Sequence, residues 1–91
     1  MTVNVRIPTP LRAYAGGSRQ VEVAGATVGD ALTDLAGRHP QLRRHLYAET
    51  GDLRGFVNVY LNDANVKDLD GTRTTMAQGD LLTIVPSIAG G

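Results

Sequence analysis

The sequence of 91 residues contains no cysteine, which excludes disulfide bonds, thiolate metal sites and a cysteine nucleophile. It has no excess of charge of either sign, because 9 lysine and arginine residues balance 9 aspartate and glutamate residues. We therefore expect no binding of nucleic acid or of an anionic membrane through an overall basic field. No apolar run is long enough to span a bilayer, and the N-terminal residues lack the apolar stretch of a secretion signal. A cytoplasmic protein is expected.

The composition is typical of one small folded domain. Hydrophobic residues make up 42% of the sequence and charged residues 20%, which favours a globular fold with one modest core over disorder. No internal repeat or linker divides the chain. We therefore predict one domain over residues 1–85, followed by an extended C-terminal tail of the same domain over residues 86–91.

Alternation of apolar and polar residues predicts the strands of a sheet. The first two strands would pair as an antiparallel hairpin with an enlarged loop. In the third strand Val57, Val59 and Leu61 would face the core, because the alternative phase would bury Asn58. The predicted strands are residues 3–7, 20–24 and 56–61, a short strand at Val66, and residues 81–85.

One amphipathic helix is predicted between the second and third strands. Thr27 is a suitable N-cap, and Asp30 places a carboxylate near the positive end of the helix dipole. Pro40 limits this helix and begins a second short helical turn. The order β-β-α-β-β-β then predicts an α+β fold in which a mixed sheet is covered on one face. The apolar stripe comprises Val28, Ala31, Leu32, Leu35 and Ala36, and the second turn carries Leu42 and Leu46.

The C-terminal residues 86–91 carry the feature most relevant to function. Pro86 has no N–H, so we expect it to end sheet pairing and to direct the chain outward. The tail ends in Gly90 and Gly91, whose carboxylate is ionised at neutral pH. Activation as an acyl adenylate would turn it into an acyl donor, and glycine would let it enter the narrow active site of a partner enzyme. An inert, disordered end is the alternative.

The chain carries four motifs that bear on its relationships: Leu-Arg-Ala-Tyr-Ala-Gly-Gly at 11–17, Val-Asn-Val-Tyr-Leu-Asn-Asp at 57–63, Gly-Asp at 79–80 and Pro-Ser-Ile-Ala-Gly-Gly at 86–91. Together they resemble the MoaD/ThiS family of sulfur carrier proteins, and the resemblance covers essentially the whole chain. Residues 7–12 and 56–66 look closest to the CysO-like branch of that family. One departure is Ser87, where the family often has a second proline.

The resemblance implies a ubiquitin-like β-grasp fold, with a mixed sheet of about five strands, one main helix over it and a flexible Gly-Gly tail. It also implies a cycle in which an E1-like enzyme adenylates Gly91 with ATP and a sulfur source converts the adenylate to a thiocarboxylate. A second enzyme would then pass the sulfur to a biosynthetic intermediate, and hydrolysis or a metalloprotease would restore Gly91. The protein would be a cosubstrate rather than an enzyme, with no cofactor or metal of its own.

Two other functions stay open. A ubiquitin-like protein modifier conjugated through Gly91 would also begin with adenylation. Lys67 is the only lysine, so chains built on lysine side chains could branch at one position only, which disfavours a chain-forming modifier. A non-catalytic binding subunit with an inert tail is the third candidate. The pathway served could be that of cysteine, molybdopterin, thiamine or a thio-modified natural product.

The β-grasp arrangement implies a docking face, because it places the last strand between the first and the third. If Leu82 and Ile84 face the helix, the residues that alternate with them lie on the exposed side of the sheet. Aromatic side chains in a partly apolar exposed patch are good interface anchors. The predicted partner-binding residues are Phe56, Tyr60, Leu81, Thr83 and Val85 on this face, and Ile88, Ala89 and Gly90 in the tail.

The remaining charged groups have simpler interpretations. His39 and His45 have no partner carboxylate at metal-binding spacing, and we expect both to be solvated. Asp30 and Asp34 are predicted to lie on an exposed helix face. The basic run 43–45 is interpreted as a solvated helix face, with docking to an acidic partner as the alternative.

Overall fold

The computed structural model describes residues 2–55 and 57–86, and these contain five strands, two α-helices and three short 3₁₀ helices. In chain order they are β1 (Thr2–Arg6), η1 (Thr9–Ala15), β2 (Gln20–Ala24), α1 (Val28–Arg38), α2 (Pro40–Leu46), β3 (Val57–Leu61), β4 (Ala64–Asn65), η2 (Val66–Asp68), η3 (Gly71–Arg73) and β5 (Leu81–Pro86).

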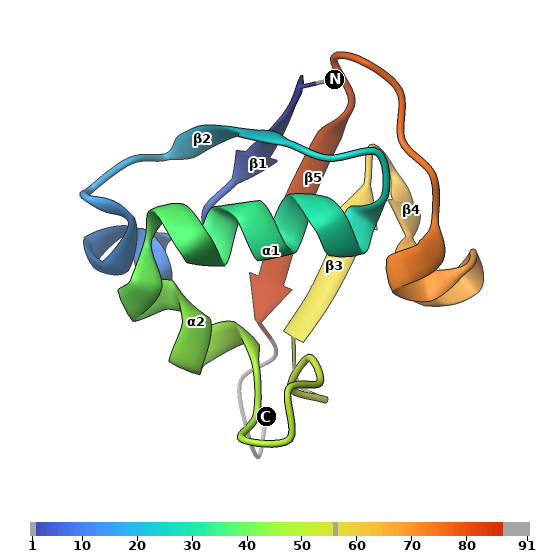
Figure 1. Cartoon of the computed structure of the whole chain (residues 1–91). Helices are drawn as coiled ribbons and strands as arrows, with labels where there is room; N and C mark the ends of the chain where they lie inside the picture. The colour runs from blue at the N-terminus through green and yellow to red at the C-terminus, as the bar shows by residue number, and fades with distance from the viewer. Residues whose placement is uncertain (1, 56, 87–91) are drawn as a thin grey trace.

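The strands form one mixed sheet in the order β2-β1-β5-β3-β4. Strand β5 pairs in parallel with β1 and antiparallel with β3, while β2 and β4 lie at the two edges. Figure 1 shows α1 lying across one face of this sheet and α2 near the end of β5. The predicted α+β fold is therefore confirmed, and its last strand occupies the centre of the sheet.

Helix α1 covers the core through the predicted apolar stripe. The Thr27 hydroxyl accepts a hydrogen bond from the Asp30 N–H at 3.2 Å, and the helix ends where His39 precedes Pro40. All five residues of the stripe are buried, as are Leu42 and Leu46 of α2. Within the described part of the chain, no helix is long and apolar enough to cross a membrane.

The inward phase of the strands also agrees with the prediction. Leu82 and Ile84 of β5 are 0% and 1% exposed, and they lie opposite Leu61 and Val59 of β3. Because side chains alternate across a strand, the residues between them lie on the sheet face away from α1. This second face, called here the open face, carries no helix in Figure 1.

The short fourth strand differs from its prediction at Val66. The strand is Ala64–Asn65, and Val66 instead begins helix η2, where its side chain is still buried. The Asn65 side chain accepts a hydrogen bond from the Lys67 N–H at 2.9 Å. This local bond turns the backbone at Asn65 and starts a 3₁₀ helix in place of a longer strand.

Pro86 was predicted to lie beyond the last strand, but it is the final residue of β5 and lies opposite Val57. The Asn62 N–H donates to the Leu81 carbonyl, so residues 62 and 81 form a hydrogen-bonded pair. Such pairs alternate along an antiparallel ladder, so the next ones are 60 with 83 and 58 with 85, and residues 57 and 86 form a pair without hydrogen bonds. Residue 86 therefore directs its nitrogen away from β3, toward the side where β1 has already ended at Arg6. The missing N–H of proline removes no ladder bond there.

Asp34 and His45 are less solvated than the sequence suggested. The Asp34 carboxylate accepts hydrogen bonds from the Ala24 N–H and the Arg38 Nε–H, both at 2.8 Å, and so connects α1 to β2. The His45 ring stacks on Tyr14, with ring centroids 4.1 Å apart. Tertiary packing of α1 on β2 and of α2 on η1 provides these partners, which the spacing of residues along one helix does not reveal.

Candidate docking site at the root of the C-terminal tail

The start of β5 is fixed by a hydrogen-bonded turn. The Asn62 side chain accepts from the Leu81 N–H at 3.2 Å, and the Asp80 carboxylate accepts from the Ala77 N–H at 2.8 Å. Asn62 has a φ of 54°, in the left-handed region that asparagine tolerates better than most residues. With its start held in this way and a strand on each side, β5 gives Pro86 a defined position at the root of the tail.

Five predicted site residues lie outside the described residues: Phe56, Ile88, Ala89, Gly90 and Gly91. Their attachment points are described. Val57, which follows Phe56, lies opposite Pro86, the first residue of the predicted tail 86–91, which is called here the tail root. The end of the sheet therefore brings the chain positions next to Phe56 and next to the tail into one strand pair.

The other predicted docking residues share the open face. Tyr60 lies opposite Thr83, and Thr83 lies opposite Arg6 of β1 on its other side. Val85 is 41% exposed, while Tyr60, Leu81 and Thr83 are half-buried. The structure thus brings four of the predicted residues together on two adjacent strands, β3 and β5, in a partly apolar patch that ends at the tail root.

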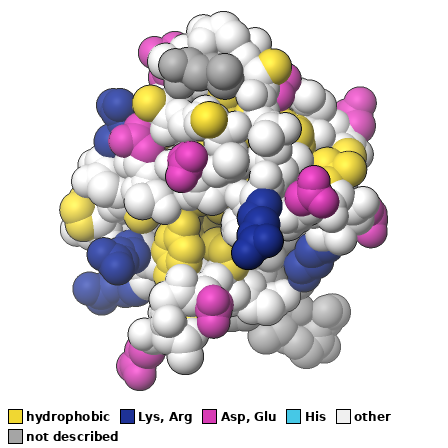
Figure 2. Space-filling model, turned by 45° about the vertical axis from the view of Figure 1, so that its right-hand side comes forward, with side chains coloured by type: hydrophobic (Ala, Val, Ile, Leu, Met, Phe, Trp, Pro, Cys, Tyr) yellow, Lys and Arg dark blue, Asp and Glu magenta, His cyan; other side chains and the backbone are white. Residues whose placement is uncertain are grey.

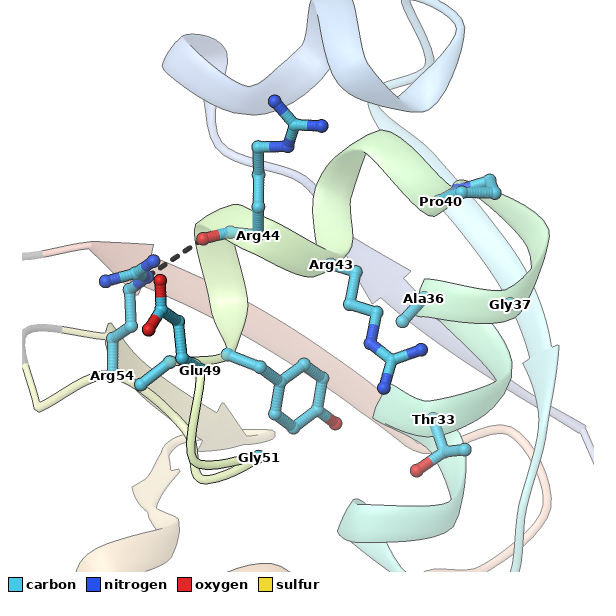
Figure 3. A pocket seen from close by; sticks show the side chains of 11 residues that line it. Thr33, Ala36, Gly37, Pro40, Arg43, Arg44, Glu49, Gly51 and Arg54 are labelled. Carbon is cyan, nitrogen blue, oxygen red and sulfur yellow. Dashed lines mark hydrogen bonds between the residues drawn. The ribbon is translucent and has the colours of Figure 1, made fainter.

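A hollow of about 330 Å³ lies beside the tail root and was not predicted as a site. Leu11 and Pro86 contribute apolar surface to it, and Arg44, His45 and Arg54 line the rest. The Arg54 Nε–H donates to the Arg44 carbonyl oxygen at 2.9 Å, as Figure 3 shows with a dashed line. Sequence reasoning missed Arg54 because ten residues separate it from Arg44, and only the packing of the loop on α2 brings the two together.

A larger, open hollow of about 740 Å³ shares Arg44 and Arg54 with the first one and extends toward Thr33 of α1. In Figure 3 Arg43 points toward Thr33, whereas Arg44 points to the other side of α2. Burial raises the pKa of the Tyr47 hydroxyl in this hollow, and neighbouring Thr33 and Arg43 oppose that rise only in part. Tyr47 is therefore a neutral phenol at physiological pH.

The described residues contain neither a metal-binding cluster nor a buried polar side-chain atom without a hydrogen-bond partner. Over residues 2–55 and 57–86, no group of three histidine, aspartate or glutamate side chains could hold a metal ion. Every buried polar side-chain atom in the same ranges already has a hydrogen-bond partner within the protein. What the fold positions is the root of a tail between a patch of the open face and a hollow lined by arginines.

The sequence profile of the ThiS family matches residues 5–91. The chain belongs to the ThiS family. This membership confirms the resemblance to MoaD/ThiS-type proteins, and the match includes the tail as well as the sheet and helices.

Individual relatives agree with the family assignment. The chain is 40% identical over 93 aligned residues to the sulfur carrier protein CysO of Mycobacterium tuberculosis, with 100% of both chains covered. It is 38% identical over 82 residues to small archaeal modifier protein 1 of Haloferax volcanii, with 87% of this chain and 90% of the relative covered. The structure matches a chain of the Amycolatopsis orientalis BexX/CysO complex with a TM-score of 0.88 and 43% identity, covering 98% and 99% of the two chains.

These matches confirm two of the sequence-based predictions. The fold is a ubiquitin-like β-grasp, shared with solved structures of CysO and of small archaeal modifier proteins. The resemblance to the CysO-like branch of the ThiS family is also confirmed by CysO relatives that span the full length of the chain.

Proposed function

We propose that this ThiS-family protein is a sulfur carrier that bears sulfur as a thiocarboxylate on Gly91. The observation that carries the proposal is the position of Pro86, which ends the central strand of the sheet five residues before Gly91. The last residues thus follow a strand that is paired with a neighbour on each side. The similarity to CysO supports the same use of the tail.

The proposed chemistry begins at the Gly91 carboxylate. Its oxygen attacks the α-phosphorus of ATP in an E1-like partner enzyme, and pyrophosphate leaves, which gives an acyl adenylate. A nucleophilic sulfur at the sulfide level then attacks the acyl carbon and displaces AMP, leaving a thiocarboxylate. The sulfur of this group attacks an electrophilic metabolite on a second enzyme, and hydrolysis of the resulting acyl–sulfur bond restores Gly91.

The body of the domain contributes binding energy rather than reactive groups in this cycle. Residues 86–91 span at most about 20 Å when extended, so the partner's active site must lie within that reach of the sheet. Docking of the open face through Tyr60 and Val85 raises the effective concentration of the tail at that active site. Gly90 and Ala89 leave room for close approach of partner backbone.

The proposal assigns ATP to the activating enzyme and no cofactor to this chain. Its partners are the E1-like enzyme, a sulfur-accepting enzyme and a metalloprotease that regenerates the tail, all in the cytoplasm, where ATP is available. Cysteine biosynthesis is the pathway that the CysO-like relationship favours. Molybdopterin, thiamine and thio-modified natural products are the alternatives.

Deletion of Gly91 tests the adenylation step. We expect the truncated protein, and Gly91→Val, to lose ATP–pyrophosphate exchange with the cognate activating enzyme. The melting temperature should stay unchanged, because chain ends that follow the last strand of a domain usually contribute little to its stability. Full exchange activity in the truncated protein would contradict the proposal.

Conjugation to other proteins is a second candidate function, favoured by the 38% identity to small archaeal modifier protein 1. It uses the same Gly91 adenylate, with a lysine amine of a target as the nucleophile. Immunoblots of an N-terminally tagged protein, expressed in the cell of origin, separate the two functions. A conjugate ladder that disappears on deletion of Gly91 supports the modifier, and a single band of free protein supports the carrier alone.

A further inference from the structure

Three arginines on and next to α2 form no ion pair with an acidic side chain of the described residues. Arg43 and Arg44 lie on α2, and Arg54 lies on the loop that leads to β3. Among residues 2–55 and 57–86 the one ion pair joins Arg38 to Asp34. The cations of the tail root are therefore available to a partner molecule.

Arg54 is held in a fixed orientation. Its backbone N–H donates to the Leu46 carbonyl at 2.8 Å, and its Nε–H donates to the Arg44 carbonyl at 2.9 Å, both in the last turn of α2. Carbonyl groups at a helix end lack N–H donors within the helix, so these bonds also satisfy the end of α2. The terminal amino groups of Arg54 remain for an end-on, bidentate contact with a carboxylate.

The surroundings of Arg44 and Arg54 form a built recess at the tail root. The hollow between them has Leu11 and Pro86 as apolar surface, and the His45 ring on its wall is stacked against Tyr14. Pro86 has the inward phase of Leu82 and Ile84, so this recess lies on the helix side of the sheet. Tyr60 and Val85 lie on the opposite, open side.

We propose that Arg44 and Arg54 form a second docking site, which binds an aspartate- or glutamate-bearing segment of the protein that holds the tail. The proposal rests on the proposed function for the identity of this partner, and it adds where and through which chemistry the partner contacts the domain. Cationic guanidinium groups with a nearby apolar recess suit a segment in which carboxylates alternate with apolar side chains. The partner would then contact the tail root from both sides of the sheet.

A nucleotide phosphate fits this site less well. Five residues separate Pro86 from the carboxylate of Gly91, and an extended tail carries that group up to about 17 Å from its root. A tail that the partner holds extended would therefore carry ATP at Gly91 beyond the reach of Arg44 and Arg54. A nucleic acid fits poorly as well, because acidic and basic side chains are interspersed on the face drawn in Figure 2 and the net charge is zero.

Glu49 provides an internal counter-charge with a predictable effect. It lies on the rim of the larger hollow with Arg54, as Figure 3 shows, yet the two form no ion pair. Its negative charge weakens the attraction of the site for an incoming carboxylate. Removal of this charge should strengthen binding, whereas removal of the arginine charges should weaken it.

A hexaglutamate peptide titrated into the ¹⁵N-labelled full-length protein at low salt tests the site, followed by NMR. We expect shifts centred on Leu11, Arg44, His45 and Arg54. The double variant Arg44→Gln/Arg54→Gln should bind about tenfold more weakly, and Glu49→Gln about twofold more tightly. The matched control Arg19→Gln/Arg73→Gln removes two exposed arginines elsewhere and should change the affinity by less than about twofold.

Three results would overturn the proposal. The two double variants could weaken peptide binding equally, the NMR shifts could spread over all arginines, or the peptide could fail to bind. Arg44→Gln alone guards against a folding effect, because the described contacts give its exposed side chain no hydrogen bond. Arg54→Lys keeps the positive charge but removes the two terminal amino groups that can bind one carboxylate together, so it should weaken binding less than Arg54→Gln does.

Exchange kinetics with the activating enzyme separate this proposal from the proposed function. The Arg44→Gln/Arg54→Gln variant should raise the KM for the carrier about tenfold and leave kcat unchanged. An unchanged KM would overturn the role of the site in docking that enzyme. Absence of exchange with the wild-type protein would instead refute the proposed function, and the peptide titration would still decide whether the anion site exists.

Discussion

Asp34 links helix α1 to the edge strand β2 through hydrogen bonds from Ala24 and Arg38. The Ala24 N–H is the main cause that lowers the pKa of this carboxyl below 3.8, and the bond from Arg38 adds to it. Because the folded-state pKa lies below the unfolded-state value, the unfolded chain binds protons more readily in acid. Asp34 therefore adds to stability above the unfolded pKa, and this contribution is lost as the pH falls through the folded pKa.

Asp34→Ala should lower the melting temperature at neutral pH, and its difference from wild type should shrink as the pH falls below 3.8. Thermal melts across an acid pH series measure both effects. Asp63→Ala is the control, because Asp63 is exposed in the turn after β3 and its carboxylate accepts no hydrogen bond from the described residues. If Asp34→Ala lowers the melting temperature equally at neutral and strongly acid pH, stability does not depend on ionisation of Asp34.

At the level of elements, the connection between β2 and α1 depends on a close backbone approach at Gly25. A Cβ at this position would lie 2.6 Å from the Ala31 nitrogen and 2.9 Å from the Ala31 Cα. These atoms belong to the helix backbone, so relief would require α1 to move relative to β2. Gly37, near the end of the same helix, has no neighbouring atom within 4 Å of such a Cβ.

Gly25→Ala should destabilise the domain by about 1–3 kcal/mol, the usual cost of forcing an extra carbon into a packed site. Gly37→Ala should stabilise it by up to about 1 kcal/mol, because alanine favours the helix. Urea unfolding of both variants measures the free energies. Equal effects of the two substitutions would show that the approach of Gly25 to α1 does not constrain the fold.

Most elements were predictable because their signals are local. The alternation in β1 and β3, the Thr27 cap, the stripe of α1 and the stop at Pro40 are all read within a few residues. The two errors at strand ends have tertiary or side-chain causes. Val66 lies outside the strand because the Asn65 side chain accepts a hydrogen bond from the Lys67 N–H and starts a 3₁₀ helix. Pro86 lies within β5 because its position in the ladder with β3 requires no N–H donor.

At the scale of the whole molecule, the tail root lies between two surfaces of different chemistry. The open face offers Tyr60, Thr83 and Val85, and the helix side offers Arg44 and Arg54. The open face was predictable, since strand phase alone assigns its residues. The arginine site was not, because Arg54 meets Arg44 only after the loop packs on α2.

Tyr60→Ala tests the open face as a docking surface for the activating enzyme. It should weaken binding by about tenfold or more, the cost of losing an aromatic anchor, with a small change in melting temperature. Isothermal titration calorimetry with the activating enzyme measures the affinity. Leu82→Ala is the contrasting control: it should cost about 2–5 kcal/mol of stability because Leu82 is fully buried, and leave the affinity of the folded protein unchanged. The opposite pattern would place Tyr60 in the core.

The intact mass of the protein isolated from its native cell tests the central claim most directly. Mass spectrometry under non-reducing, mild conditions should reveal a fraction in which one oxygen atom is replaced by sulfur, and fragmentation should locate the exchange at Gly91. The fraction should vanish when the activating enzyme is deleted. An unmodified Gly91 carboxylate in every molecule, in cells that express the activating enzyme and a sulfur source, would contradict the assignment as a sulfur carrier.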